Sequence, residues 1–193
     1  DSRIGKRFLF PGIGYGGSCF PKDVKALHKS GEENNHDFEI LSSVIKVNSK
    51  QKTILIPKIV SKYGNELEGK TFGIWGLAFK PETDDIREAP ALYMIDELLK
   101  RGAKINVFDP EAMPNVKRKY GDRIQFADNM YDAITGVDAL IICTEWSIFR
   151  TPDFSKLKNN MKEPMIFDGR NLYDTKEIEN EGFNYVSIGR KSV

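Results

Sequence analysis

The stretch Thr71-Phe72-Gly73-Ile74-Trp75 decides the fold class of this chain. It is a short apolar run that begins just after Gly69 and ends at Gly76. A helical pattern follows over about residues 89–101. A buried strand, a glycine-containing turn and a helix in this order are typical of the first unit of a parallel sheet.

The rest of the chain repeats this alternation. Short apolar runs predict further strands, and the spacing over 129–135 predicts another helix. Strands that alternate with helices indicate an α/β fold with a doubly wound, mostly parallel, Rossmann-like sheet. The additional predicted strands lie at 105–109, 124–127, 138–143, 165–168 and 185–188.

The first 65 residues follow a different pattern. A short helix is expected over 22–29 and should end at Gly31, and Asp37 can cap a longer helix that reaches Gly64. Pro57 should kink or break the longer helix. Its apolar stripe is long enough to need a partner, so we expect a homodimer through residues 37–63; packing within one chain is the alternative. The stripe contains Phe38, Leu41, Ile45, Asn48, Leu55, Ile59 and Tyr63, of which Asn48 is the type of residue that fixes register in a helix pair.

Composition excludes several classes of function. The 193 residues include 29 basic and 28 acidic side chains, a net charge of +1, which argues against binding to nucleic acid or to anionic membranes. No apolar run approaches the roughly 20 residues of a membrane helix. Two cysteines in unlike contexts do not form a disulfide framework, and Cys143 lies in an apolar run typical of a buried strand. A reducing cytoplasm is therefore the expected location.

Glycines and a thiol meet in the stretch 10-FPGIGYGGSCFPKD-23. Four glycines within residues 12–17 allow a backbone to approach a ligand closely. A helix N-terminus and Lys22 would favour the thiolate form of Cys19, which is the nucleophilic form. A small, buried and inert cysteine is the competing interpretation. The local sequence leaves both open.

The string Gly-Gly-Ser-Cys-Phe-Pro-Lys-Asp over 16–23 resembles the catalytic-cysteine motif of the UDP-glucose/GDP-mannose dehydrogenase family. The order of the other motifs makes the resemblance specific over nearly the whole chain. They are Phe79-Lys80, Asp84-Asp85-Ile86-Arg87-Glu88, Thr144-Glu145-Trp146 and Asp168-Gly169-Arg170.

The resemblance implies a division into domains and a role for each matching residue. Residues 1–65 match a central dimerisation segment and 66–193 a UDP-sugar-binding domain. Cys19 matches the nucleophile, Asp23 a residue that helps to activate water, and Lys22 a catalytic residue near the NAD cofactor. Matches to substrate-binding residues are Arg3 (across the dimer), Phe10, Gly12, Gly14, Tyr15, Gly16, Phe79, Lys80 and Arg170, and Arg87 matches a cofactor contact.

The implied reaction is oxidation of a sugar C6 alcohol to a carboxylate with two NAD, through a thiohemiacetal and a thioester on Cys19. Phe20 favours UDP-glucose, because GDP-mannose enzymes often have leucine there; a UDP-hexosamine is a further alternative. The family's principal NAD domain has no counterpart here, so this chain alone is expected to be inactive. A non-catalytic nucleotide-sugar-binding module is the rival of another class. His28 and His36 lack companion ligands, so no metal site is expected.

Overall fold

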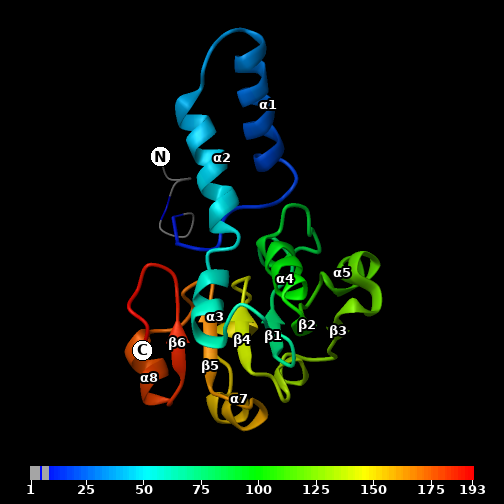
Figure 1. Cartoon of the computed structure of the whole chain (residues 1–193), viewed down its shortest axis with the longest axis vertical. Coiled ribbons are helices and arrows are strands. Elements are labelled where there is room, and N and C mark those ends of the chain that lie inside the picture. Colours follow the sequence, from blue (N-terminus) through cyan, green and yellow to red (C-terminus); the bar gives the residue numbers. More distant parts are fainter. Residues whose placement is uncertain (1–4, 6–8) are drawn as a thin grey trace.

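The computed structural model describes residue 5 and residues 9–193 of the chain. Two regions are distinct (Figure 1). A helical hairpin, formed by α1 (Phe20–Glu33) and α2 (Glu39–Gln51), stands on an α/β domain. We call this hairpin the arm. The helix α3 (Ile56–Tyr63) follows α2 and lies against the α/β domain.

The α/β domain contains one parallel sheet of six strands in the order β3-β2-β1-β4-β5-β6. From β1 the chain adds β2 and β3 on one side of the sheet and then crosses to add β4, β5 and β6 on the other side. This change creates a switch point at the carboxyl ends of β1 and β4. The prediction of a doubly wound α/β fold is therefore confirmed. The strands are β1 (Thr71–Trp75), β2 (Lys104–Phe108), β3 (Gln125–Phe126), β4 (Ala139–Ile142), β5 (Met165–Asp168) and β6 (Asn184–Val186).

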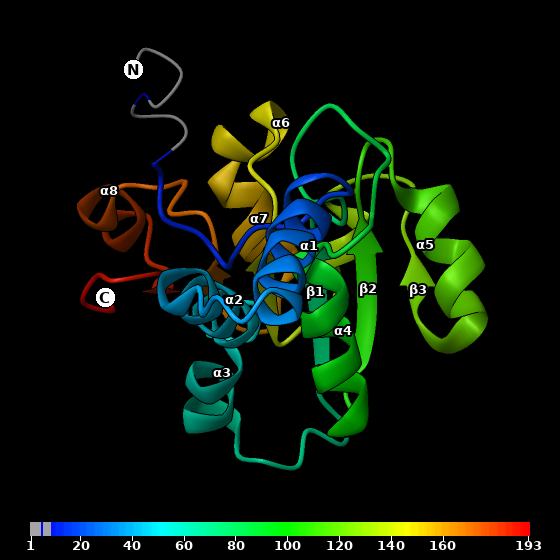
Figure 2. The same cartoon turned by 90° about the horizontal axis from the view of Figure 1, so that it is seen from above.

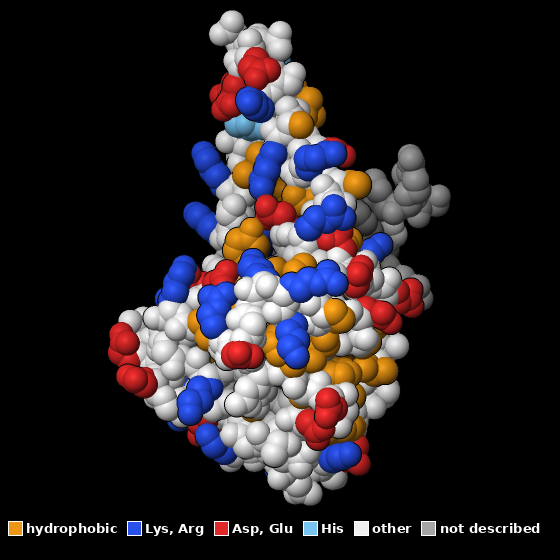
Figure 3. Space-filling model, turned by 90° about the vertical axis from the view of Figure 1, so that its right-hand side faces the viewer, with side chains coloured by type: hydrophobic (Ala, Val, Ile, Leu, Met, Phe, Trp, Pro, Cys, Tyr) orange, Lys and Arg blue, Asp and Glu red, His pale blue; other side chains and the backbone are white. Residues whose placement is uncertain are grey.

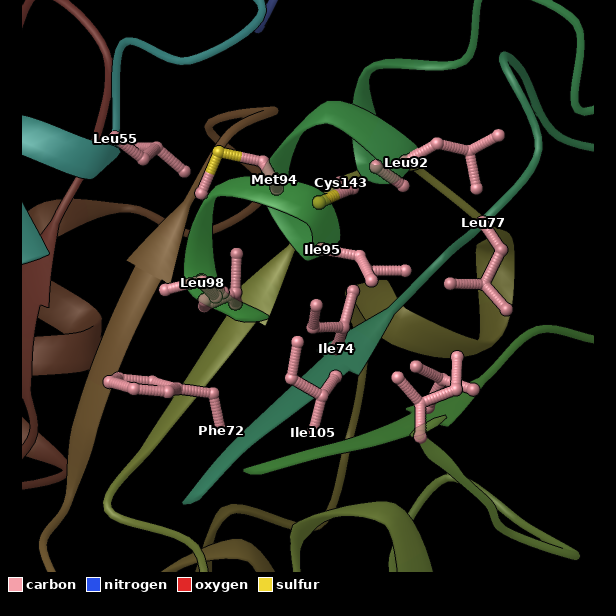
Figure 4. Close-up of a cluster of buried hydrophobic side chains, with 14 of the residues drawn as sticks. Leu55, Phe72, Ile74, Leu77, Leu92, Met94, Ile95, Leu98, Ile105 and Cys143 are labelled. Atoms are coloured by element: carbon pink, nitrogen blue, oxygen red, sulfur yellow. The ribbon is translucent and has the colours of Figure 1, made fainter. Parts of the chain in front are cut away.

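Helices cover both faces of the sheet. Figure 2 shows α3 and α4 on one side and α6 and α7 on the other. Alternate strand residues enter separate apolar clusters: Phe72 and Ile74 belong to the cluster under α3 and α4, and Trp75 belongs to the opposite one. Figure 4 shows the first of these clusters beneath α4. The helices of this domain are α4 (Pro90–Lys100), α5 (Met113–Tyr120), α6 (Ser147–Arg150), α7 (Phe154–Asn160) and α8 (Thr175–Asn180).

The predicted helix over 129–135 is wrong in type. The structure has only a 3₁₀ turn at Asp132–Ile134. The Asn129 side chain accepts hydrogen bonds from the backbone N–H groups of Tyr131 and Asp132, at 2.9 and 3.1 Å. Such side-chain bonds compete with an α-helix.

The first helix of the arm is longer than predicted. It passes through Gly31, which was expected to end it. A Cβ at Gly31 would lie 2.5 Å from the Phe38 ring, so this glycine allows the two helices to approach. The N-cap of α2 is Phe38 and makes no side-chain cap hydrogen bond, so the prediction that Asp37 caps this helix is also wrong.

The predicted break near Pro57 is confirmed, but it lies at residues 52–55, and the stripe is not continuous. Proline at 57 clashes with a helical carbonyl four residues earlier. The chain turns there through bonds such as Ile56 N–H to Thr53 O, at 2.9 Å. Ile59 in α3 is buried on the α/β domain, whereas α2 has no buried residue. The part of the stripe on α3 is therefore buried by its own chain, and the part on α2 is at most half-buried.

Within the described residues, no helix has the length and apolarity to cross a membrane.

Candidate active site at the glycine and cysteine loop

The loop over residues 12–18 lies at the carboxyl edge of the sheet, beneath the arm. Ile13 is buried against Gly169, which directly follows β5. Gly17 donates its N–H to the Arg87 carbonyl at 2.8 Å, in the connection from β1 to α4. This edge is where open α/β sheets bind their ligands.

Side chains of α2 hold the first half of the loop. The Asn48 amide accepts from Tyr15 N–H at 2.8 Å and donates to Tyr15 O at 3.2 Å. Gln51 Nε2 donates to Gly12 O at 2.7 Å. The prediction that Asn48 fixes register in a helix pair is therefore corrected, because its amide is bonded within its own chain.

Two glycines are required by close packing against predicted substrate residues. A Cβ at Gly12 would overlap the Arg170 guanidinium. Gly17 has φ of +92°, and a Cβ there would lie 2.9 Å from the Phe79 ring. The structure thus brings Gly17 to Phe79, 62 positions later, and Gly12 to Arg170, 158 positions later, so both contacts depend on the tertiary fold.

Cys19 is the N-cap of α1 and is exposed, which excludes a small buried cysteine. Its Sγ lies 3.6 Å from Ser18 Oγ. In the next turn, Lys22 Nζ lies 3.9 Å from Asp23 Oδ1, and both side chains are largely exposed. By contrast, Cys143 is buried. Burial raises the pKa of its thiol and so disfavours the nucleophilic thiolate, which agrees with a structural role.

The two predicted cofactor residues lie beside this cysteine. Lys22 and Arg87 line one open groove of about 440 Å³, together with Gly17 and Ser18. Hydrogen bonds to Asp85, at 2.9 and 2.8 Å, raise the pKa of Arg87, and the nearby Cys19 adds to the rise. Figure 3 shows Lys and Arg side chains along the arm and where it meets the α/β domain. The groove therefore offers cations to an anionic ligand next to an exposed thiol.

The predicted substrate residues after β1 and β5 differ in their surroundings. Arg170 is mostly buried and donates from Nη2 to Glu145 Oε1 at 2.7 Å. Its Nε is buried and has no hydrogen-bond partner among the described residues. Lys80 is exposed, with Nζ 5.5 Å from the centre of the Phe79 ring.

The remaining predicted substrate residues are placed as follows. Gly14 adjoins the Asn48 side chain, and Gly16 adjoins the carbonyl of Glu88. Phe10 is 56% exposed at the start of the loop and is not enclosed by it. Arg3 lies outside the described residues.

Two buried aspartates that were not predicted as site residues shape this edge of the sheet. Asp109 accepts from Leu77 N–H at 2.7 Å and from Trp146 Nε1 at 3.2 Å. Asp168 accepts from Arg170 N–H at 2.7 Å and from the Tyr185 hydroxyl at 2.8 Å, and burial raises its pKa. An aspartate at the end of a buried strand, before a turn, is the sequence signal that marks both. Among the described residues, no His, Cys, Asp and Glu side chains are grouped as a metal site.

Comparisons with known proteins agree with this geometry. The UDP-glucose/GDP-mannose dehydrogenase family matches through its central domain at residues 1–50 and its UDP binding domain at residues 73–175.

Individual relatives match over nearly the whole chain. A UDP-glucose 6-dehydrogenase of Pseudomonas aeruginosa is 44% identical over 98% of this chain and 43% of its own length. Another from Bacillus subtilis is 42% identical over 100% of this chain and 44% of its own length. The solved structure of a UDP-glucose dehydrogenase from Pyrobaculum islandicum superposes with a TM-score of 0.82 at 31% identity, covering 98% of this chain and 40% of that one. The chain thus spans less than half the length of these relatives, and it belongs to the UDP-glucose/GDP-mannose dehydrogenase family.

Proposed function

We propose that this chain is the C-terminal part of an NAD-dependent UDP-glucose 6-dehydrogenase, which oxidises UDP-glucose to UDP-glucuronate. One observation carries the proposal: an exposed cysteine caps α1 beside a groove lined by Lys22 and Arg87. An alcohol dehydrogenase that stops at the aldehyde needs no such thiol. The relatives named UDP-glucose 6-dehydrogenase support the same activity.

In the proposed reaction, Cys19 acts on the aldehyde formed by the first oxidation of C6. Its thiolate adds to the carbonyl carbon and forms a thiohemiacetal, so the aldehyde is retained. Loss of a hydride from this carbon and of the proton from its hydroxyl group leaves a thioester. Water then adds to the thioester with the help of Asp23, and the thiolate leaves as the carboxylate forms.

NAD, when bound, would supply the hydride acceptor for each of the two oxidations. Lys22 and Arg87 fit this cofactor, because both cations line the groove beside Cys19 and can face a pyrophosphate. We propose that the rest of the NAD site belongs to a portion that precedes this chain, so the chain alone is inactive. An exposed, reduced thiol is best maintained in the cytoplasm, where we place the reaction.

The substrate site is proposed at the loop and the adjoining carboxyl edge of the sheet. Arg170 and Lys80 supply positive charge for the diphosphate, Phe79 packs against the loop, and Tyr15 and the loop backbone enclose the sugar. The residue after the cysteine, Phe20, favours UDP-glucose. GDP-mannose and UDP-hexosamines are the competing substrates.

A homodimer through α2 is also proposed. Ile40 is 82% exposed and Val47 is 63% exposed, and both line a shallow groove along this helix. Because α2 buries no residue within its own chain, a second copy is the partner we propose for this face. Arg3 would reach the substrate of the neighbouring copy.

The stoichiometry of the complete enzyme tests the proposed function. Purified enzyme that carries this chain should reduce two NAD for each UDP-glucose consumed and release UDP-glucuronate. GDP-mannose and a UDP-hexosamine, tested in parallel, should be oxidised far more slowly. One NAD per sugar with release of free aldehyde would contradict the cysteine mechanism, and no oxidation would favour a non-catalytic binding module.

A further inference from the structure

A polar cluster centred on Glu88 lies behind the cysteine loop. Its carboxylate accepts from Lys52 Nζ at 2.5 Å and from the Tyr93 hydroxyl at 2.7 Å, both on Oε2. Lys25 Nζ donates to Oε1 at 3.1 Å. The three donors come from the turn between α2 and α3, from α4 and from α1. One carboxylate therefore connects the arm with the α/β domain.

Burial makes this cluster more than a surface ion pair. The Lys52 side chain is only 5% exposed, and its Nζ lies 4.2 Å from the centre of the Tyr93 ring. The hydrogen bond from Lys52, and to a smaller extent the one from Tyr93, lowers the pKa of Glu88 to about 2. A buried ammonium needs a fixed counter-charge, and Glu88 supplies it.

The backbone of Glu88 is held in an unusual conformation that faces the loop. Its φ is +54°, a left-handed value that is unfavourable for a residue other than glycine. With this backbone, the preceding carbonyl of Arg87 accepts from Gly17 N–H, and the carbonyl of Glu88 occupies the space where Gly16 would have a Cβ. The two carbonyls therefore contact Gly16 and Gly17, the residues that directly precede Ser18 and Cys19.

We propose that Glu88 is a positioning residue for Cys19. Its carboxylate, held by Lys52, Lys25 and Tyr93, keeps the Arg87 and Glu88 carbonyls in place against Gly16 and Gly17. Asn48 and Gln51 hold the first half of the loop, over residues 12–15, and Glu88 holds the second half. The catalytic consequence rests on the proposed function, whereas the effect on the loop does not.

Amide hydrogen exchange in this chain tests the proposal without any activity. Glu88→Gln keeps the size of the side chain and removes the charge that pairs with Lys52 and Lys25. Exchange at Gly17 N–H should accelerate about tenfold or more, because the restraint on its acceptor is lost. Exchange at Tyr15 N–H, which Asn48 holds, should change less than about twofold.

A matched control is available on α4. Glu97 also pairs with two cations, Lys100 at 2.8 Å and Arg101 at 2.7 Å, but among the described residues it makes no hydrogen bond or ion pair with the loop over 12–18.

 Glu97→Gln should therefore leave exchange at Gly17 unchanged. Protection of the Ile74 amide in β1 reports that each variant is folded. If Glu88→Gln alone fails to fold, the double variant Lys52→Met/Glu88→Gln also removes the buried cation. Exchange at Gly17 N–H is then measured in the double variant, with the same expected result.

Kinetics of the complete enzyme give the second readout. Glu88→Gln should lower kcat about tenfold or more while the dissociation constant for UDP changes less than about twofold, since Arg170 and Lys80 keep their places. If the unaltered enzyme does not oxidise UDP-glucose, the proposed function fails, and the exchange result still decides the role of Glu88. Unchanged exchange at Gly17 in a folded Glu88 variant, or equal changes in Glu97→Gln, would overturn the proposal.

Discussion

The arm and the α/β domain bury their residues in very different ways. The domain has an apolar cluster on each face of its sheet, and β4 and β5 are buried throughout. In the arm, α1 buries only Pro21 and Gly31, and α2 buries no residue. The domain therefore has its own core, whereas the arm depends on polar contacts at the junction and on the partner we propose.

The site that we propose lies at the boundary between these two regions. The loop and Cys19 lie where the arm meets the carboxyl edge of the sheet, and their backbone is held from both sides, by Asn48 of the arm and by Arg87 of the domain. A site built across this junction would combine Cys19 and Lys22 of the arm with Arg87 of the domain. Variants in each region should therefore separate catalysis, stability, binding and assembly.

The largest effect is expected from removing the thiol. In the complete enzyme, Cys19→Ser should lower UDP-glucose turnover roughly 10⁴-fold or more, because loss of a covalent nucleophile removes a whole reaction path. The affinity for UDP, measured by calorimetry, should be nearly unchanged because the α/β domain supplies those contacts. Cys143→Ala, which removes the buried thiol, is the control and should retain turnover. Turnover by Cys19→Ser within tenfold of the parent would show that this junction does not supply the nucleophile.

The next effect separates the cores of the two regions. Ile74→Ala in β1 should lower the free energy of unfolding by about 2–5 kcal/mol, because it opens a cavity in a fully buried cluster. Leu27→Ala on α1, where the side chain is 50% exposed, should change it by about 0.5 kcal/mol or less. Urea unfolding followed by circular dichroism measures both. Equal losses would contradict the view that only the domain has its own core.

Substrate binding should respond to the domain's cations. Arg170→Ala and Lys80→Ala should each weaken UDP binding roughly ten- to a hundredfold, since one charge-assisted hydrogen bond contributes about 1.5–3 kcal/mol. Arg87→Ala should act mainly on NAD. Lys104→Ala, at the amino end of β2, is the matched control and should bind UDP normally. Unchanged affinity in both of the first two variants would move the substrate site away from this edge.

The smallest effect on the fold is expected on the exposed face of α2. Val47→Asp should leave the secondary structure intact, because this side chain is exposed within its own chain, but it should convert a dimer into a monomer. Ser30→Asp, an exposed position on α1, adds the same charge and should remain dimeric. Light scattering of the complete enzyme measures the change. A dimer that persists in Val47→Asp would place the interface elsewhere.

The sequence predicted the fold well where local pattern decides it. The bounds of β1 and β5 match the predicted strands, because uninterrupted apolar runs between turns have few other uses in an α/β domain. The turn at Asp132–Ile134 was predicted as a helix, because the spacing of apolar residues does not reveal that Asn129 captures the backbone.

The site was only partly predictable for the same reason. The motifs predicted roles for Cys19, Lys22 and Arg87. In the structure, Lys22 and Arg87 line one groove, and Cys19 follows directly after Ser18, which also lines it. The partners of the loop were not predictable: Asn48 reaches Tyr15 across 33 residues, and Glu88 reaches Lys52 across 36. Such pairs depend on how the arm meets the domain, which no local pattern contains.

Mass spectrometry of the complete enzyme, quenched with acid during turnover of UDP-glucose and NAD, tests the central claim most directly. Acid slows hydrolysis of a thioester, so the intermediate should survive digestion. The peptide that contains Cys19 should carry a UDP-glucuronyl group, and this adduct should be absent from Cys19→Ser and from samples without NAD. An adduct on Cys143, or rapid turnover with no adduct on Cys19, would contradict the claim that the thiol at the junction carries the reaction.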